Sequence, residues 1–225
     1  IETVSSYPTY EDCPLPVQAI WKKKYERNEY LHQYTLEKSY ESKAAIFAEY
    51  GKIICVSMGI YDKARDEYRI KSYYGHEEKI LLEEFAVALA ALKKNYQLCG
   101  HNIKEFDIPY LCRRFLICQM PIPKLLNFQD KKPWEIELLD TLQLWKFGDY
   151  KNYTSLETLT TIFDIPSPKE DIDGGMVGHV YWIENNLERI VEYCQQDVIA
   201  LIQVYCRLSQ MPLIHESQFQ IISST

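Results

Sequence analysis

The sequence lacks several features that would place it in a specialised class of protein. Its seven cysteines form no Cys-x-x-Cys pair, which excludes a zinc ribbon and a thioredoxin-like redox motif. No apolar run approaches the roughly 18 residues that a membrane-spanning helix needs, and no signal-peptide pattern is present. The cysteines lie mostly in apolar stretches, as buried thiols do in a reducing compartment. We therefore expect a cytoplasmic protein with no membrane partner.

Positive charge is also scarce, because the net charge is −7. Proteins that coat nucleic acid without sequence preference are usually basic, so the charge argues against that class. It does not exclude an enzyme that binds one strand end, since metal-binding carboxylates themselves make the charge more negative. Internal repeats and low-complexity tracts are absent as well. With 225 residues, 47% of them apolar, we interpret residues 1–225 as a single domain.

Hydrophobic periodicity predicts an alternation of strands and helices. Strands are expected at residues 1–4, 53–61, 67–74, 96–99 and 135–145, with a hairpin turn at 62–66. Helices are expected at residues 17–28, 43–50, 77–94, 107–118, 155–163, 176–183 and 185–209. This order indicates an α/β protein with a mixed five-stranded sheet and helices on both faces. We interpret residues 5–50 as a mostly helical insertion.

The last expected helix contains an acidic residue in an unusual position. At about 100° per residue, its apolar side chains form one stripe. Asp197 falls inside this stripe, where an ionised carboxylate needs a cation, a basic partner or several hydrogen-bond donors. Tyr193 lies one turn earlier, so its hydroxyl can reach the same place. Because Asp197 is in the middle of the helix, it cannot be an N-cap, and we predict a functional role.

A second acidic residue lies at the junction between the strand near Cys99 and the helix that begins at Asp107. The C-terminal edge of a sheet is where α/β proteins place their sites. However, the helix dipole alone also favours an acidic residue in a first turn. Glu2, near the start of the chain, would by itself be an ordinary solvated residue.

Together, these residues resemble the acidic motifs of the DnaQ-like exonucleases, which have an RNase H-like fold. The second motif of that family is an Asn followed by Phe-Asp, matched by Asn102 and Phe106-Asp107. The third motif in the tyrosine subclass is Tyr-x3-Asp, matched by Tyr193 and Asp197. The first motif is Asp-x-Glu, of which Glu2 supplies the second half. The resemblance is to the proofreading domains of family-B DNA polymerases and to stand-alone bacterial exonucleases similar to them.

The resemblance implies a 3′-5′ exonuclease that releases nucleoside 5′-monophosphates from the 3′ end of single-stranded nucleic acid, DNA rather than RNA. Its cofactors would be two divalent cations, Mg²⁺ or Mn²⁺, about 4 Å apart, which activate water and stabilise the leaving oxygen. The resemblance assigns Glu2, Asp107 and Asp197 to the metals. Tyr193 would orient the attacking water.

Several neighbouring residues have two interpretations each. Asp140 either supports the metal-binding residues from behind or caps a turn. Asn102 either holds the terminal nucleotide or ends a strand, and Phe106 either packs in the core or lies near the terminal base. Arg114 either contacts a backbone phosphate or belongs to a solvated charged surface.

Two alternatives stay open at the level of function. The same chemistry could act on RNA or on short oligonucleotides. The first Asp of the family would precede Ile1, so the chain as given lacks one expected ligand. Either the sequence starts late, which is the interpretation we favour, or the protein is a catalytically inactive RNase H-like module that binds nucleic acid or protein.

Overall fold

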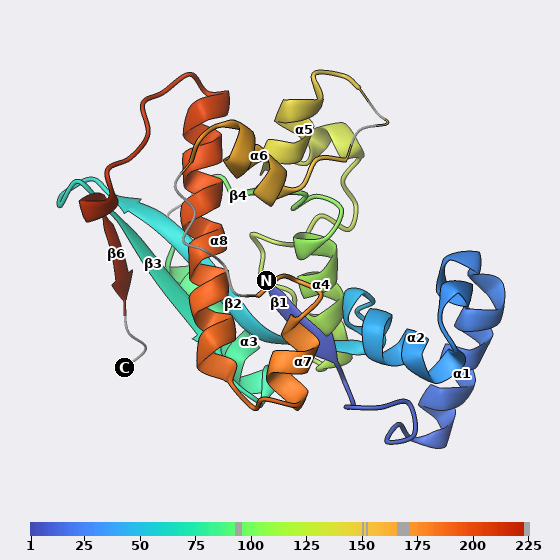
Figure 1. The fold of residues 1–225 in the computed structure, drawn as a ribbon. Coiled ribbons are helices and arrows are strands. Elements are labelled where there is room, and N and C mark those ends of the chain that lie inside the picture. Colours follow the sequence, from blue (N-terminus) through green and yellow to red (C-terminus); the bar gives the residue numbers. More distant parts are fainter. Residues whose placement is uncertain (93–95, 150, 152, 166–171, 223–225) are drawn as a thin grey trace.

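The computed structural model describes residues 1–92, 96–149, 151, 153–165 and 172–222, and Figure 1 shows their arrangement. The strands are β1 (Glu2–Ser5), β2 (Gly51–Asp62), β3 (Glu67–Tyr74), β4 (Cys99–Gly100), β5 (Leu139–Asp140) and β6 (Phe219–Ile222). The helices are α1 (Leu15–Arg27), α2 (Leu36–Lys43), α3 (Glu78–Ala91), α4 (Asp107–Ile117), α5 (Thr141–Lys146), α6 (Leu156–Ile162), α7 (Val177–Trp182) and α8 (Leu187–Leu208). Among the described helices, none combines the length and apolar character needed to cross a bilayer.

The strands form two sheets, not the single five-stranded sheet predicted. The larger sheet has the order β1-β2-β3-β6, in which β6 is parallel to β3 and the other pairs are antiparallel. The smaller sheet contains β4 and β5 in parallel. β1 pairs only with residues 51–55 of β2, and β4 has two residues, so neither bridges the two sheets in the described part of the chain. β6 was not predicted from the sequence.

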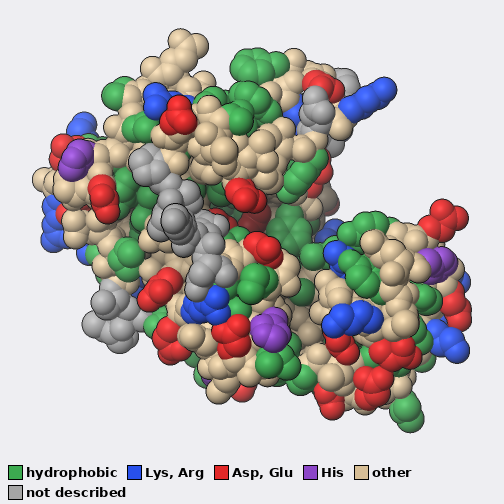
Figure 2. Space-filling view, in the orientation of Figure 1, with side chains coloured by type: hydrophobic (Ala, Val, Ile, Leu, Met, Phe, Trp, Pro, Cys, Tyr) green, Lys and Arg blue, Asp and Glu red, His purple; other side chains and the backbone are tan. Residues whose placement is uncertain are grey.

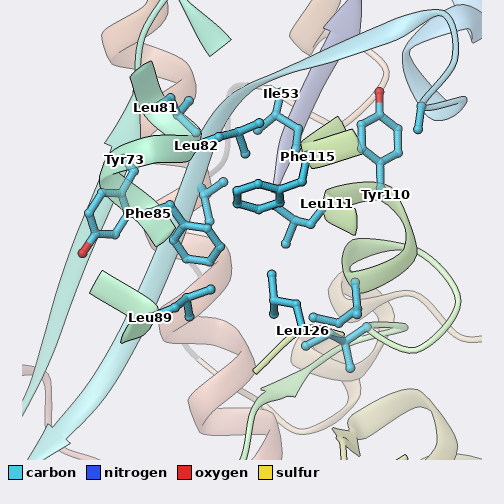
Figure 3. Close-up of a cluster of buried hydrophobic side chains, with 14 of the residues drawn as sticks. Ile53, Tyr73, Leu81, Leu82, Phe85, Leu89, Tyr110, Leu111, Phe115 and Leu126 are labelled. Atoms are coloured by element: carbon cyan, nitrogen blue, oxygen red, sulfur yellow. The ribbon is translucent and has the colours of Figure 1, made fainter. Parts of the chain in front are cut away.

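Helices cover both faces of the larger sheet, as predicted. On one face, α3 and α4 pack against β2 and β3 through Phe85, Leu111 and Phe115 (Figure 3). On the other face, α7 and α8 pack against β1 and β2 through Val4, Ile54 and other apolar side chains. The largest side chains in both cores are apolar, so burial of apolar surface holds the layers together.

Two sequence predictions about secondary structure are wrong. Residues 135–145 alternate like a strand, but only β5 is extended, and α5 begins at Thr141. The cause is Asp140, whose carboxylate accepts the amide hydrogens of Leu142 and Gln143 and so caps the helix. The α-helix expected at residues 43–50 is also absent: α2 begins after its N-cap Thr35 and ends at Lys43, and only a 3-10 turn, Ala44–Ile46, follows.

The insertion forms a helical lobe, residues 6–50, between β1 and β2. Its own core surrounds Trp21, whose indole N–H donates to Ser39 Oγ at 3.1 Å. Figure 2 shows the lobe standing apart from the body at the right of the view. The chain leaves the sheet at Ser5 and returns at Gly51, and these two residues are register partners. The two ends of the lobe therefore meet on the β1–β2 ladder, and the carbonyl of Ala45 near its end accepts hydrogen bonds from Thr3 and Tyr110.

A buried ion pair joins the lobe, the sheet and two helices. Arg114 on α4 donates to both carboxylate oxygens of Glu78 on α3, and also to the carbonyl of Ala48 at 2.8 Å. Glu78 accepts the amide hydrogen of Ile53 on β2 at 2.7 Å. Arg114 is only 7% exposed, so the interpretation of this residue as a phosphate contact is wrong.

Candidate active site

Three of the predicted acidic residues line one cavity. The cavity has a volume of about 450 Å³ and lies between β2, α8 and the β4–α4 junction. Glu2, Asp107 and Asp197 all contribute to its wall, although they lie far apart in the sequence. We call this space the carboxylate cavity. Most of the remaining lining is apolar, and no Lys or Arg is among its described lining residues.

Each carboxylate comes from a different element. Glu2 lies on β1 opposite Cys55 and is buried, whereas Asp107, at the start of α4, and Asp197, on α8, are half-buried. The predicted stripe of α8 faces this cavity, with Val198 among the lining residues. α8 passes close to β2 at Gly59, where an added Cβ would lie 3.0 Å from Val198 Cγ1. A glycine at this crossing therefore lets the helix bring Asp197 close to the sheet.

The electrostatics show that the carboxylates influence one another. Burial is the main cause that raises the pKa of the Glu2 carboxyl well above its usual value, and the carboxylates of Asp197 and Asp107 add to it. The amine nitrogen of Ile1 lies 3.0 Å from Asp107 Oδ1. Burial alone would favour the neutral amine, but Asp107 and Glu2 outweigh it and raise the pKa of the amine. The carboxyl groups of Glu2, Asp107 and Asp197 therefore interact electrostatically across the cavity.

These residues fit a hard divalent cation in donor chemistry and in charge. Carboxylate oxygens are the ligands that Mg²⁺ and Mn²⁺ prefer, and no Lys or Arg occupies the described lining of the cavity. Within the described ranges, no three His, Cys, Asp or Glu side chains stand close enough to enclose one ion. The carboxylates thus surround the cavity but do not form a closed cage.

A comparison with protein families agrees with this arrangement. Residues 46–220 match a family described as a predicted 3′-5′ exonuclease related to the exonuclease domain of PolB. The chain belongs to this exonuclease family. Asp107, Tyr193 and Asp197 lie inside the matched range, whereas Glu2 precedes it and is placed at the site by the structure. No curated protein matches the sequence.

In this member of the exonuclease family, Asp140 both caps a helix and holds the turn before Asp107. Its side chain is 2% exposed. Besides capping α5, it accepts the amide hydrogen of Asn102 at 3.0 Å and that of Lys104 at 3.1 Å. The structure confirms that Asp140 caps a helix, whereas its support of metal-binding residues stays a prediction. Because it links the two short strands, it positions the segment that presents the Asp107 carboxylate.

Asn102 and Phe106 lie within that turn. The backbone of Asn102 is left-handed, with φ of 58°, and its carbonyl accepts the amide hydrogens of Glu105 and Phe106. Its side-chain Oδ1 is buried and has no hydrogen-bond partner in the described part of the chain, and Asn102 is not among the residues that line the carboxylate cavity. Phe106 packs partly against the core, with its ring centroid 5.5 Å from that of Tyr110.

Tyr193 precedes Asp197 by one turn of α8. It is half-buried and packs against the apolar cluster between α8 and the sheet. It is not among the residues that line the carboxylate cavity. The structure thus brings Glu2, Asp107 and Asp197 to one cavity and places Tyr193 on the neighbouring turn of the helix.

Sequence reasoning gave no role to His101, which the structure places in the wall of the cavity. Its Nε2 lies 2.8 Å from the carbonyl oxygen of Thr154 and its Nδ1 lies 2.9 Å from Thr141 Oγ1. A carbonyl only accepts, so Nε2 carries a proton. Burial lowers the pKa of His101, which favours the neutral ring. No spacing pattern could reveal this, because both partners lie far along the chain.

Proposed function

We propose that this protein is a metal-dependent 3′-5′ exonuclease that removes nucleoside 5′-monophosphates from single-stranded DNA. The observation that supports this most strongly is the meeting of Glu2, Asp107 and Asp197 at one cavity. Three acidic groups without a lysine or arginine among their described neighbours in the cavity wall form a site for positive charge. Membership of the exonuclease family supports the reaction class.

Glu2, Asp107 and Asp197 would hold two Mg²⁺ or Mn²⁺ ions. When bound, such ions supply positive charge opposite the scissile phosphate and promote deprotonation of the attacking water. In a longer chain, the residue joined to Ile1 would lie beside Asp107, because the Ile1 nitrogen is 3.0 Å from that carboxylate. An acidic residue there would add a further ligand.

The neighbouring polar groups would handle the substrate and the water. The phenolic hydroxyl of Tyr193 both donates and accepts hydrogen bonds, so it can orient the attacking water without changing its own protonation. A rotation of the Asn102 side chain would expose its buried, unpartnered Oδ1 as an acceptor for the terminal nucleotide. Asp140 would act indirectly, because its hydrogen bonds hold the turn that contains Asn102 and leads to Asp107.

The test is a nuclease assay of the full-length gene product on labelled single-stranded DNA and RNA with Mg²⁺, Mn²⁺ or EDTA. We expect mononucleotides to be released from the 3′ end of DNA only when a divalent cation is present. Asp197→Asn should lower the rate by about a thousandfold or more, equivalent to about 4 kcal/mol of transition-state stabilisation. Glu192→Gln, an exposed acid on the same helix, should retain the wild-type rate.

Other outcomes would redirect or refute the proposal. Faster release from RNA than from DNA would make RNA the substrate. Binding of single strands without hydrolysis in any cation would indicate a non-catalytic binding module. Full activity of Asp197→Asn would show that the carboxylate cavity is not the active site.

A further inference from the structure

One carbonyl oxygen at the base of the lobe joins the two elements that carry Glu2 and Asp107. The carbonyl of Ala45 accepts the hydroxyl hydrogen of Thr3, on β1, at 2.9 Å. It also accepts the hydroxyl hydrogen of Tyr110, on α4, at 2.8 Å. A carbonyl oxygen has two lone pairs, so these two bonds use its full capacity as an acceptor. We call Thr3, Ala45 and Tyr110 the hydroxyl bridge.

On α4, the hydroxyl bridge begins one turn after Asp107. The ring of Tyr110 lies at the edge of the apolar core, and its hydroxyl points away from the other side chains of the cluster (Figure 3). Burial raises the pKa of Tyr110, so the hydroxyl stays protonated and can donate. One turn farther along the helix, Arg114 donates to the carbonyl of Ala48 at 2.8 Å. Two successive turns of α4 are therefore bonded to the base of the lobe.

On β1, the hydroxyl bridge lies next to an irregularity of the ladder. The register shifts between Glu2 and Thr3, where Ile54 of β2 is an extra residue. A bulge of this kind locally disrupts the ladder and changes the direction of neighbouring side chains. The ladder alone therefore holds Glu2 weakly, and the bond from Thr3 to Ala45 anchors the strand directly after it.

Gly51, the first residue of β2, makes room for the hydroxyl bridge. A Cβ at this position would overlap the hydroxyl of Tyr110 and lie 2.9 Å from the carbonyl oxygen of Ala45. Because Gly51 has no side chain, Tyr110 can reach the lobe past the start of the strand. The bridge is thus formed where the chain re-enters the sheet.

We propose that Tyr110 is a positioning residue for the carboxylate cavity. Through the hydroxyl bridge, it sets the distance between the carboxylates of Glu2 and Asp107. This inference rests on the proposed exonuclease function and names the contact that holds two of the metal ligands in place. Ligands on separate elements bind a divalent cation tightly only when the surrounding structure holds them in the required geometry. Tyr110 and Thr3 lie outside the described lining of the cavity, so the bridge acts through the positions of the carboxylates.

The test compares the full-length gene product with its Tyr110→Phe variant, which loses only the hydroxyl. We expect the Kd for Mn²⁺, measured by isothermal titration calorimetry, to rise about tenfold. On single-stranded DNA, kcat should fall about a hundredfold and KM should stay within about twofold, because the carboxylates are misplaced but the rest of the site is unchanged. Thr3→Val should weaken Mn²⁺ binding as well, whereas Thr3→Ser keeps the donor and should match the wild type.

Tyr40→Phe is the matched control. Tyr40 is also a buried tyrosine, and its hydroxyl also bonds to a carbonyl of the lobe, that of Tyr50. It belongs to the core around Trp21 and not to the hydroxyl bridge. Its loss should lower the free energy of unfolding about as much as Tyr110→Phe does, but leave Mn²⁺ binding and kcat unchanged.

Wild-type Mn²⁺ affinity and kcat in Tyr110→Phe would overturn the inference while leaving the exonuclease function intact. Equal losses in Tyr110→Phe and Tyr40→Phe would overturn it too, because they would reflect stability alone. If the wild type hydrolyses no nucleic acid, the proposed function fails, and crystal structures of the two proteins decide the inference alone. The separation of the Glu2 and Asp107 carboxylates should then differ by about 1 Å between wild type and Tyr110→Phe, and an equal separation would refute the positioning role.

Discussion

The acidic residues of this protein occur in two contrasting environments. Glu78 is buried against Arg114 and also accepts a backbone amide hydrogen, so its charge is neutralised within the chain. Glu2, Asp107 and Asp197 instead share a cavity that has no Lys or Arg among its described lining residues. The first arrangement fixes the layers of the fold. The second keeps negative charges close together, and such a group is stabilised when a cation binds.

The largest effect should come from breaking the neutralised pair. Arg114→Met leaves Glu78 buried without its partner and should lower the free energy of unfolding by about 3–5 kcal/mol. Urea denaturation measures this loss. Glu41→Gln removes an exposed pair with Lys38 and should change stability by less than about 1 kcal/mol. Equal effects of the two substitutions would mean that Glu78 and Arg114 do not hold the layers together.

Asp140 shows whether an acid that accepts backbone amide hydrogens stabilises the fold as much as Glu78 does. Asp140→Ala removes a helix cap and leaves the amides of Asn102 and Lys104 without their acceptor. We expect a loss of about 2–3 kcal/mol, together with a lower kcat because the turn before Asp107 loosens. Asp140→Asn keeps one acceptor oxygen and should restore part of both. If Asp140→Ala were as stable as the wild type, Asp140 would not stabilise the fold in the way that Glu78 does.

Replacing an acid of the carboxylate cavity should not lower stability, in contrast to replacing Arg114 or Asp140. Asp197→Asn removes an acid whose charge opposes ionisation of Glu2, so stability without metal should stay the same or rise slightly. Adding Mg²⁺ at about ten times its dissociation constant should stabilise the wild type by about 1.4 kcal/mol and leave the variant unaffected. Thermal unfolding with and without Mg²⁺ measures both. If Asp197→Asn lost stability without metal, Asp197 would stabilise the fold as Glu78 does.

The smallest effect should come from His101, whose ring is neutral, unlike Glu78 and unlike the acids of the cavity. Its pKa is lowered in the folded protein, so the unfolded chain binds the additional proton as pH falls below about 6.5. Protonation therefore favours unfolding, and the wild type should lose stability between pH 7 and pH 5. His101→Gln should show a shallower decline in chemical denaturation over this range. A steeper decline in the variant would contradict the neutral assignment.

The sequence predicts elements well where the signal is local. The hairpin at residues 62–66 and the long helix with Asp197 are correct, because turn residues and helical periodicity determine them within a few residues. The strand expected at residues 135–145 is wrong because the capping bonds of Asp140 outweigh the alternating pattern. The pair of Glu78 and Arg114 was missed, since neither residue carries a motif and their contact is formed only by packing.

Local sequence signals also predict only part of the candidate site. Asp107 and Asp197 are recognisable from their motifs, and the structure places both beside Glu2. Their catalytic roles stay a prediction. His101 could not be found from spacing, because its hydrogen bond with Thr154 joins residues that are distant in the sequence. Contacts of this kind depend on how the two short strands and α5 meet.

The attachment of the lobe has a consequence for how this protein can vary. The lobe begins and ends at register partners, Ser5 and Gly51, and the carbonyls of Ala45 and Ala48 near its end accept hydrogen bonds from α4. The family match begins at residue 46, within this last part of the lobe. Lengthening such a loop costs only about 0.6 kcal/mol for each doubling. The part of the lobe that precedes Ala45 has its own core around Trp21, so we expect changes in its length to leave the β1–β2 ladder and the carboxylate cavity in place.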